Sequence, residues 1–206
     1  MNIYSKFLKT FLDRFVALIA LLILLPILII TAILIKLDSP GKIIFKQVRI
    51  GKDEKEFSIF KFRTMKEKIR DSETDKERIT KLGYNLRKFS IDELPQLLNI
   101  IIGDMSFIGP RPLYPKYLPF YTDREKLRHA VRPGMSGLSE VLGRSYLTWD
   151  EQFEYDAQYV EKLSFLMDLD IFLKTIPMLF NAHNVIVDGR VNKLDFAKHR
   201  TQQNKL

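Results

Sequence analysis

The stretch FVALIALLILLPILIITAILI occupies residues 15–35 and carries no charged side chain. About twenty consecutive apolar residues are enough to cross the hydrocarbon core of a bilayer as one helix. The run is too long for the apolar part of a secretory signal peptide, and no cleavage site of small residues follows it. We therefore predict a membrane helix that the mature protein retains.

The flanks of this run leave its topology open. Basic residues lie on both sides of it, namely Lys6, Lys9 and Arg14 before the run and Lys36, Lys42 and Lys46 after it. Because the positive-inside rule places such residues in the cytoplasm, it gives a simple span no clear orientation. Pro26, at the midpoint, removes a helical hydrogen bond and predicts a kink. The residues fit equally a kinked span and a re-entrant helix that returns to the cytoplasm.

The overall composition limits the chemistry of the chain. The 206 residues carry a formal net charge of +8, which indicates an anionic partner. Nucleic acid, acidic lipid head groups and a phosphate-bearing substrate all meet that description. The sequence has no cysteine, which excludes disulfides, thiolate nucleophiles and zinc-thiolate sites. Any metal site must therefore use oxygen or histidine ligands.

A small sheet is predicted directly after the apolar run. The turn at 38–41 separates the two, and runs of β-branched and aromatic residues at 43–50 and 57–62 predict a β-hairpin. Lys61 and Arg63 occupy alternate positions at its end. Side chains two residues apart point to the same side of a strand, so we expect both cations on one face.

The rest of the chain is predicted to be helical. An apolar pattern resumes at 82–89 and brings Arg87 close to residues 90–100. Helices are predicted at 115–128 and 148–163, followed by an amphipathic helix at 164–180. Thr148 and Glu151 form the pattern of a capping box, which places a helix N-terminus there. The polar and basic residues from 184 onward predict a tail. The sequence therefore describes one helix-rich domain with a small sheet.

Two adjacent acids, Asp92 and Glu93, lie within the stretch SIDELPQLLNI at 90–100. Ser90 and Glu93 fit a capping box, whereas Pro95 suits a helix whose N-cap is Asp92. In either frame the acids lie at a helix N-terminus, where free amides and the helix dipole favour a carboxylate or a bound phosphate. The pair is either a helix cap or an active centre, and these residues alone do not decide between the two.

Arginines lie close to the acids or beside glycine and proline. Arg87 precedes the acids, Arg111 lies within GPRP, Arg132 begins RPG, and Arg144 follows Gly143. Arginines held by rigid loops are a common way to clamp phosphates. Surface arginines beside turns are also frequent, so the pattern is weak when it stands alone.

Several longer motifs follow one another along the chain. They are SPG at 39–41, QVRIG at 47–51, KFRTM at 61–65, DELPQ at 92–96, GDMSFIGPRP at 103–112, RPG at 132–134 and GR at 143–144. Together they resemble the bacterial sugar transferase family, the monotopic phosphoglycosyl transferases, and in particular its small members limited to a catalytic core. The resemblance extends from the membrane segment to about Leu173. One departure is Leu25, because members of this size often have serine before the kinking proline.

The resemblance implies an α/β (α+β) fold on a membrane anchor. The expected structure is a helix-rich compact cytoplasmic domain with a small β-hairpin, an N-terminal re-entrant membrane helix and interfacial amphipathic helices. The re-entrant helix would occupy 1–37, the phosphoglycosyl transferase catalytic domain 38–183, and a basic C-terminal tail 184–206. The expected location is the cytoplasmic face of the bacterial inner membrane.

The resemblance also implies a reaction and its residues. The family transfers a phosphosugar from a UDP-sugar to polyprenyl (undecaprenyl) phosphate and releases UMP, as the first membrane step of glycoconjugate biosynthesis. Asp92 matches the nucleophile that forms an aspartyl-phosphosugar, and Glu93 with Asp92 would bind Mg²⁺ on the diphosphate. The cations expected to neutralise phosphates are Lys61, Arg63, Arg87, Arg111, Arg132 and Arg144.

A non-catalytic alternative follows from the same charge and membrane segment. A membrane-anchored basic domain could bind nucleic acid or acidic lipid without performing a reaction. The enzymatic interpretation instead names a UDP-sugar, polyprenyl phosphate and inner-membrane lipid as partners and excludes nucleic acid. The residues identify neither the sugar nor the glycan pathway, and they leave the oligomeric state open, a homodimer included.

Overall fold

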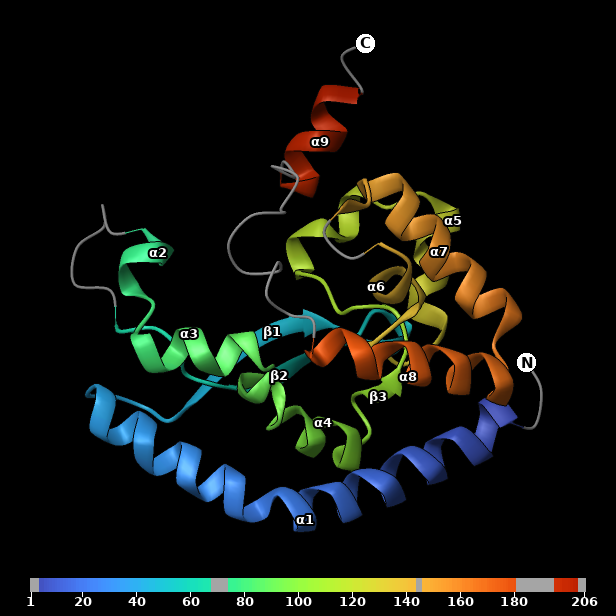
Figure 1. Ribbon diagram of the computed structural model, residues 1–206. Helices are drawn as coiled ribbons and strands as arrows, with labels where there is room; N and C mark the ends of the chain where they lie inside the picture. Colours follow the sequence, from blue (N-terminus) through green and yellow to red (C-terminus); the bar gives the residue numbers. More distant parts are fainter. Residues whose placement is uncertain (1–3, 68–73, 144–145, 181–194, 204–206) are drawn as a thin grey trace.

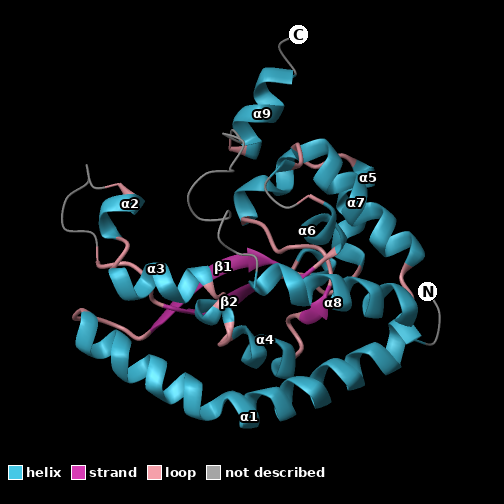
Figure 2. Ribbon diagram, in the orientation of Figure 1, coloured by secondary structure: helices cyan, strands magenta, loops and turns pink. Residues whose placement is uncertain are grey.

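The computed structural model describes residues 4–67, 74–143, 146–180 and 195–203. Helices dominate it, with two small sheets at the centre (Figure 2). Its helical elements are η1 (Tyr4–Leu8), α1 (Lys9–Asp38), η2 (Lys52–Glu54), α2 (Asp75–Arg78), α3 (Lys81–Lys88), η3 (Ile91–Glu93), α4 (Gln96–Ile102), η4 (Pro115–Phe120), α5 (Asp123–Lys126), η5 (Leu127–Ala130), α6 (Leu138–Leu142), α7 (Trp149–Lys162), α8 (Phe165–Phe180) and α9 (Phe196–Gln203). The strands are β1 (Ile44–Ile50), β2 (Glu56–Phe62), β3 (Ser106–Ile108) and β4 (Gly134–Ser136).

Helix α1 contains the apolar run and bends in its middle. Figure 1 shows its two halves rising toward the same side, with the rest of the protein lying inside the bend. Pro26 lies within this helix and has no N–H to donate to the carbonyl of Leu22, which accounts for a bend. Among the described residues, α1 is the one helix long and apolar enough to cross a membrane. Protein buries only 11% of its most apolar window, so the outer face is uncovered.

Both ends of α1 are bonded to the folded domain. Near the N-terminal end, Lys9 Nζ lies 2.6 Å from Asp168 Oδ2 of α8. At the C-terminal end, Arg63 donates to the carbonyl oxygen of Ser39 at 2.6 Å. Between these ends α4 packs across the helix, where Ala17 and Ile100 are fully buried in one apolar cluster. The middle of α1 is thus held on one side only.

The predicted hairpin is confirmed. Strands β1 and β2 pair antiparallel, with Ile44 opposite Phe62 and Ile50 opposite Glu56. The short turn η2 joins them. A second sheet, formed by β3 and β4, is parallel and pairs Ser106 with Gly134 and Ile108 with Ser136. The α4 helix leads into β3, so this second sheet places the loop that follows β3 beside the central acids.

The predicted helices are confirmed in part. Thr148 and Glu151 form both bonds of the capping box that begins α7, and α8 is amphipathic as expected. The expected helix at 115–128 is instead divided into η4, α5 and η5. Pro119 has no N–H for a helical ladder, and Thr122 starts a new capping box three residues later. The structure therefore has a helix-rich fold with small sheets, as predicted.

The predicted tail contains a packed segment. Residues 184–194 and 204–206 lie outside the described part of the chain. Within it, α9 places Phe196, which is fully buried, against Tyr117, Trp149 and Phe153. Nothing in the sequence indicated this contact, because a single aromatic residue in a polar segment does not produce a periodic apolar pattern.

Candidate active site

Neither predicted helix cap forms at the central acids. Ser90 adopts the left-handed conformation, with φ of 55°, and its side chain makes no capping bond. A single 3-10 turn, η3, then carries Asp92 and Glu93, and α4 begins after Pro95 without a side-chain cap. Both capping predictions are therefore wrong. The reversal at Ser90 starts a separate turn, which leaves the two carboxylates available for other partners.

Glu93 binds two cations. Its Oε1 accepts a 2.6 Å hydrogen bond from Lys61 Nζ and lies 3.7 Å from Arg111 Nη2. Burial alone would raise the pKa of Glu93, but Lys61 and Arg111, together with a hydrogen bond from Gln96, hold it below its usual range. In turn, the charge of Glu93 raises the pKa of Arg111. Glu93 therefore stays ionised in the physiological range.

Asp92 has a different environment. The residue is 8% exposed, and no side chain among the described residues donates a hydrogen bond to it. Burial, followed by the neighbouring charge of Glu93, raises the pKa of Asp92 to about 6, against the opposing effect of Lys61 and Arg87. Because this pKa lies below 7, Asp92 is mainly ionised at neutral pH. The carboxylate is charged but poorly solvated, which suits a nucleophile.

Four separate segments bring this cluster together. Lys61 comes from the end of β2, Arg87 from the last turn of α3, the acids from η3, and Arg111 from the loop after β3. Arg87 Nε donates to Thr64 Oγ1 at 2.9 Å, which fixes the direction of the guanidinium. A compact group of three cations thus surrounds two carboxylates, and such a group can bind a polyphosphate.

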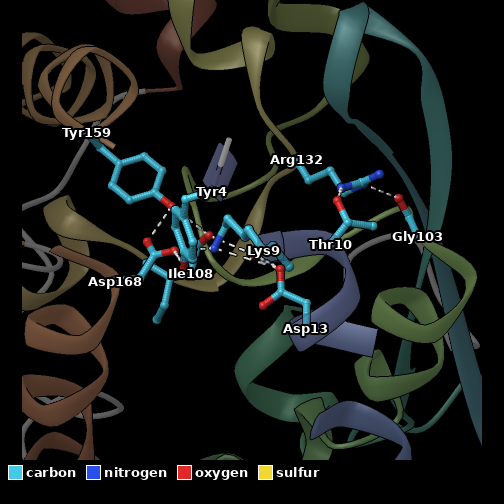
Figure 3. Close-up of polar contacts among 10 residues, drawn as sticks. Tyr4, Lys9, Thr10, Asp13, Gly103, Ile108, Arg132, Tyr159 and Asp168 are labelled. Atoms are coloured by element: carbon cyan, nitrogen blue, oxygen red, sulfur yellow. Dashed lines mark hydrogen bonds and ion pairs between the residues drawn. The ribbon is translucent and has the colours of Figure 1, made fainter. Parts of the chain in front are cut away.

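Two other predicted phosphate ligands lie elsewhere. Arg63 follows the end of β2, and its guanidinium binds the carbonyls of Ser39 and Pro40 at the C-terminus of α1. Its guanidinium and the Lys61 ammonium therefore bind different partners. Arg132 donates to Thr10 Oγ1 of α1 and to the carbonyl of Gly103, as Figure 3 shows. The structure brings neither residue to the acids, and Arg144 lies outside the described residues.

Asn99, which we did not predict as a functional residue, holds the site in place. Asn99 is fully buried, and its side chain both accepts from the backbone N–H of Phe60 and donates to the carbonyl of Ser58. These two bonds fasten β2 to α4 and so place Lys61 beside Glu93. A polar signal was visible, because Gln96 and Asn99 interrupt an otherwise apolar run. Buried amides in such a run require partners.

The donor set of the site fits Mg²⁺. Among the residues that the structure describes, no three histidine, cysteine or acidic side chains gather into a metal cage. Mg²⁺ does not require one, since it commonly binds one or two carboxylates and completes its shell with phosphate oxygens and water. Asp92 and Glu93 supply two adjacent carboxylates, one of them without a hydrogen-bonding side chain.

Comparisons with known proteins give a consistent result. A family model described as "Bacterial sugar transferase" matches residues 4–182. The uncharacterized sugar transferase EpsL of Bacillus subtilis is 43% identical over 173 residues, which cover 82% of this chain and 85% of EpsL. A UDP-glucose:undecaprenyl-phosphate glucose-1-phosphate transferase of Caulobacter vibrioides is 35% identical, covering 85% of this chain and 71% of that protein. A UDP-N-acetylgalactosamine-undecaprenyl-phosphate N-acetylgalactosaminephosphotransferase of Aeromonas hydrophila is 38% identical, covering 82% of this chain and 43% of that protein.

Proposed function

Because the chain belongs to the bacterial sugar transferase family, we propose that it transfers a phosphosugar from a UDP-sugar to undecaprenyl phosphate and releases UMP. Membership makes the chain an enzyme, which sets aside the non-catalytic alternative. The names of relatives that state a donor give different sugars, glucose in one case and N-acetylgalactosamine in another, so they do not identify the sugar of this chain. The names of other relatives place them in exopolysaccharide production. We propose the same kind of pathway for this chain.

The observation that carries the proposal is the environment of Asp92. An ionised carboxylate with a pKa of about 6, no hydrogen-bonding side chain and nearby cations is equipped to attack phosphorus. In the first step, Asp92 would attack the β-phosphorus of the donor. The bond from that phosphorus to the bridging oxygen breaks, and UMP leaves with the electron pair. The product is an aspartyl-phosphosugar.

The second step restores the carboxylate. A phosphate oxygen of undecaprenyl phosphate attacks the same phosphorus, and the bond to Asp92 breaks. Lys61, Arg87 and Arg111 would hold the phosphate oxygens and balance their charge in both steps. Glu93 keeps two of these cations in position, since Lys61 and Arg111 both contact its carboxylate. The same contacts keep Glu93 ionised.

Mg²⁺ is the cofactor that we propose for this site. Glu93, with Asp92, would hold the ion. When bound, it supplies neutralisation of the charge on the donor diphosphate.

We further propose that α1 is re-entrant and that the domain lies on the cytoplasmic face of the inner membrane. A full span places its two ends about 30 Å apart on opposite sides of the bilayer. Both ends of α1 are bonded to one domain, through Lys9 with Asp168 and through Arg63 with Ser39. A bilayer cannot separate them without breaking these contacts. The exposed apolar stripe of α8 would rest on the interface, with Phe165, Leu166, Leu169, Phe172, Leu173 and Ile176.

A nucleotide release assay tests the proposed function. The full chain in detergent micelles would receive undecaprenyl phosphate, Mg²⁺ and each member of a panel of UDP-sugars. We expect UMP release from at least one donor, dependent on the lipid acceptor for multiple turnover. Release of UDP instead would indicate an ordinary glycosyl transfer and would contradict the proposal. Omitting the donor sugar, by supplying UDP alone, is the control for contaminating phosphatases.

A further inference from the structure

The loop that carries Arg111 is held at every backbone carbonyl from 110 to 113. Pro110 accepts from the N–H of Gly134, and Leu113 accepts from the N–H of Ile50, both at 3.0 Å. Pro112 accepts from Arg49 at 3.5 Å. The carbonyl of Arg111 itself accepts from Arg128 Nη2 at 2.6 Å, which is the shortest of the four. The backbone that aims Arg111 is therefore fixed by four bonds from three elements, β1, β4 and η5.

The bond to the Arg111 carbonyl differs from the others because a buried ion pair supplies it. The side chains of Arg128 and Asp156 are 2% and 1% exposed, and Arg128 Nη2 lies 3.0 Å from Asp156 Oδ2. Arg128 belongs to η5 and Asp156 to α7, so the pair joins two helices beneath the loop. Removing two charges from water offsets most of their attraction, which makes such a pair a weak source of stability.

Additional contacts fix the orientation of this pair. Asp156 Oδ1 accepts from Ser139 Oγ at 3.1 Å, and Arg128 Nη1 lies 3.3 Å from the hydroxyl of Tyr121. The guanidinium carbon of Arg128 also lies 5.0 Å from the ring centre of Phe153. With partners on several sides, the guanidinium has one direction in which to present Nη2. That direction is toward the carbonyl of Arg111.

We propose that Arg128 and Asp156 are positioning residues that set Arg111 against the phosphates of the donor. The chain of contacts runs from Asp156 to Arg128, then to the backbone of Arg111, and from its guanidinium to Glu93. The inference rests on the proposed function, because it takes Arg111 as a phosphate ligand. Neither Arg128 nor Asp156 touches the acids, so they act through Arg111. Loss of the pair would let the arginine swing away from the diphosphate.

A double-mutant cycle with Arg111 tests this inference. Asp156→Asn keeps the shape of the side chain and removes its charge. The probe is UDP, which contains the diphosphate of every UDP-sugar, titrated calorimetrically into the full chain in micelles with Mg²⁺. We expect Asp156→Asn to weaken UDP binding by about tenfold in the wild-type background. In the Arg111→Ala background, which binds UDP weakly already, the same change should have less than about a twofold effect.

The thermal stability of the same four proteins separates positioning from folding. Asp156→Asn should lower the melting temperature by a similar amount in both backgrounds, since the buried pair is broken in each. Arg124→Gln is the matched control, because Arg124 bonds two exposed glutamates of the same helix, Glu154 and Glu161. It should leave UDP binding unchanged. If Asp156→Asn does not fold, Ser139→Ala removes one bond to Asp156 and should weaken UDP binding in the same background-dependent way.

Three results would overturn the inference. Wild-type affinity for UDP in folded Asp156→Asn would show that the pair does not position the loop. An equal weakening in both backgrounds would show that it acts on the site without Arg111. An Arg111→Ala protein with wild-type affinity would remove Arg111 from the phosphate site, and the inference would fail with it. UMP release in the donor assay would still stand in the first two cases, so they contradict the positioning role alone.

Discussion

Two lysine–carboxylate pairs of equal length have opposite surroundings in this protein. Lys61 lies 2.6 Å from Glu93 at the candidate active site, and Lys9 lies 2.6 Å from Asp168 at the junction between α1 and α8. At the junction, Asp168 also accepts from the hydroxyls of Tyr4 and Tyr159, at 2.6 and 2.8 Å (Figure 3). Lys9 and Asp168 are both buried and are paired with each other. The junction is a closed network.

The candidate active site differs because its network is open. Beside Glu93 lies Asp92, to which no side chain in the described part of the chain donates a hydrogen bond. Its pKa is raised to about 6, chiefly by burial. A buried charge that lacks hydrogen-bond partners lowers the stability of the fold, and a bound ligand can stabilise that charge. We therefore propose that the Lys9–Asp168 pair holds the fold, whereas Asp92, beside the Lys61–Glu93 pair, performs chemistry.

Replacing the open carboxylate should have the largest effect. Asp92→Asn removes the nucleophile, so we expect UMP release to fall at least about a thousandfold. The same change should stabilise the fold at pH 7. The folded pKa of about 6 exceeds the ordinary aspartate value of 3.8, so ionisation of Asp92 costs the native state about 3 kcal/mol.

The stabilising effect should depend on pH. A raised carboxyl pKa contributes stability below pH 3.8, and this contribution is lost as the pH rises through about 6. Asp92→Asn should therefore melt higher than the wild type at pH 7 and nearly equal to it at pH 4. Melting scans in EDTA measure this without a bound cation. If Asp92→Asn instead melts lower than the wild type at pH 7, Asp92 stabilises the fold, as Asp168 does.

Glu93→Gln should have the next largest effect on activity. The neutral amide cannot balance Lys61 and Arg111, and it is a weaker ligand for Mg²⁺ than a carboxylate. We expect UMP release to fall about 10- to 100-fold and half-maximal activity to require about tenfold more Mg²⁺. A titration of activity against Mg²⁺ measures both. An unchanged Mg²⁺ requirement would remove Glu93 from the proposed ligands.

Breaking the Lys9–Asp168 pair should lower the stability of the fold and leave the candidate active site unchanged. Asp168→Asn leaves Lys9 buried with an incomplete partner, which should cost about 3 kcal/mol of unfolding free energy. Asp170→Asn is the matched control on the same helix, since its pair with Lys174 is exposed and should cost less than about 1 kcal/mol. Melting in micelles compares the two. The folded fraction of Asp168→Asn should keep the wild-type affinity for UDP. A selective loss of that affinity would contradict a purely structural role for the Lys9–Asp168 pair.

The smallest expected effect is on the acid limb of the pH profile. Protonated Asp92 cannot attack, so kcat/KM for the donor should fall as the pH drops through about 6. Arg87 lowers the pKa of Asp92, and Arg87→Gln should therefore move this limb to higher pH by a few tenths of a unit. A limb that moves to lower pH would contradict the charge arrangement that we describe.

Local pattern predicted the hairpin, the capping box at Thr148 and the amphipathic character of α8. These features depend on neighbours in sequence, such as turn residues and apolar spacing. The division of 115–128 into three pieces was missed, although Pro119 was visible. The burial of Phe196 was missed because its partners lie far away in the chain.

The candidate site, like the fold, was predictable only in part. Motif order singled out Asp92, Glu93 and Arg111, and the structure brings them together. Sequence could not assign Arg63 to the end of α1 or Arg132 to Thr10, because an arginine reaches several angstroms from its backbone. Residue type does not tell which carbonyl or hydroxyl it meets. The same limit concealed the buried contact from Arg128 to the Arg111 backbone.

Trapping of the covalent intermediate tests whether Asp92 is the nucleophile. The full chain would be mixed with Mg²⁺ and the active UDP-sugar in the absence of undecaprenyl phosphate, and its intact mass measured. We expect a gain in mass equal to one phosphosugar, located on the peptide that contains Asp92, and no gain in Asp92→Asn. Donor-dependent UMP release in Asp92→Asn with the adduct on another residue would contradict it.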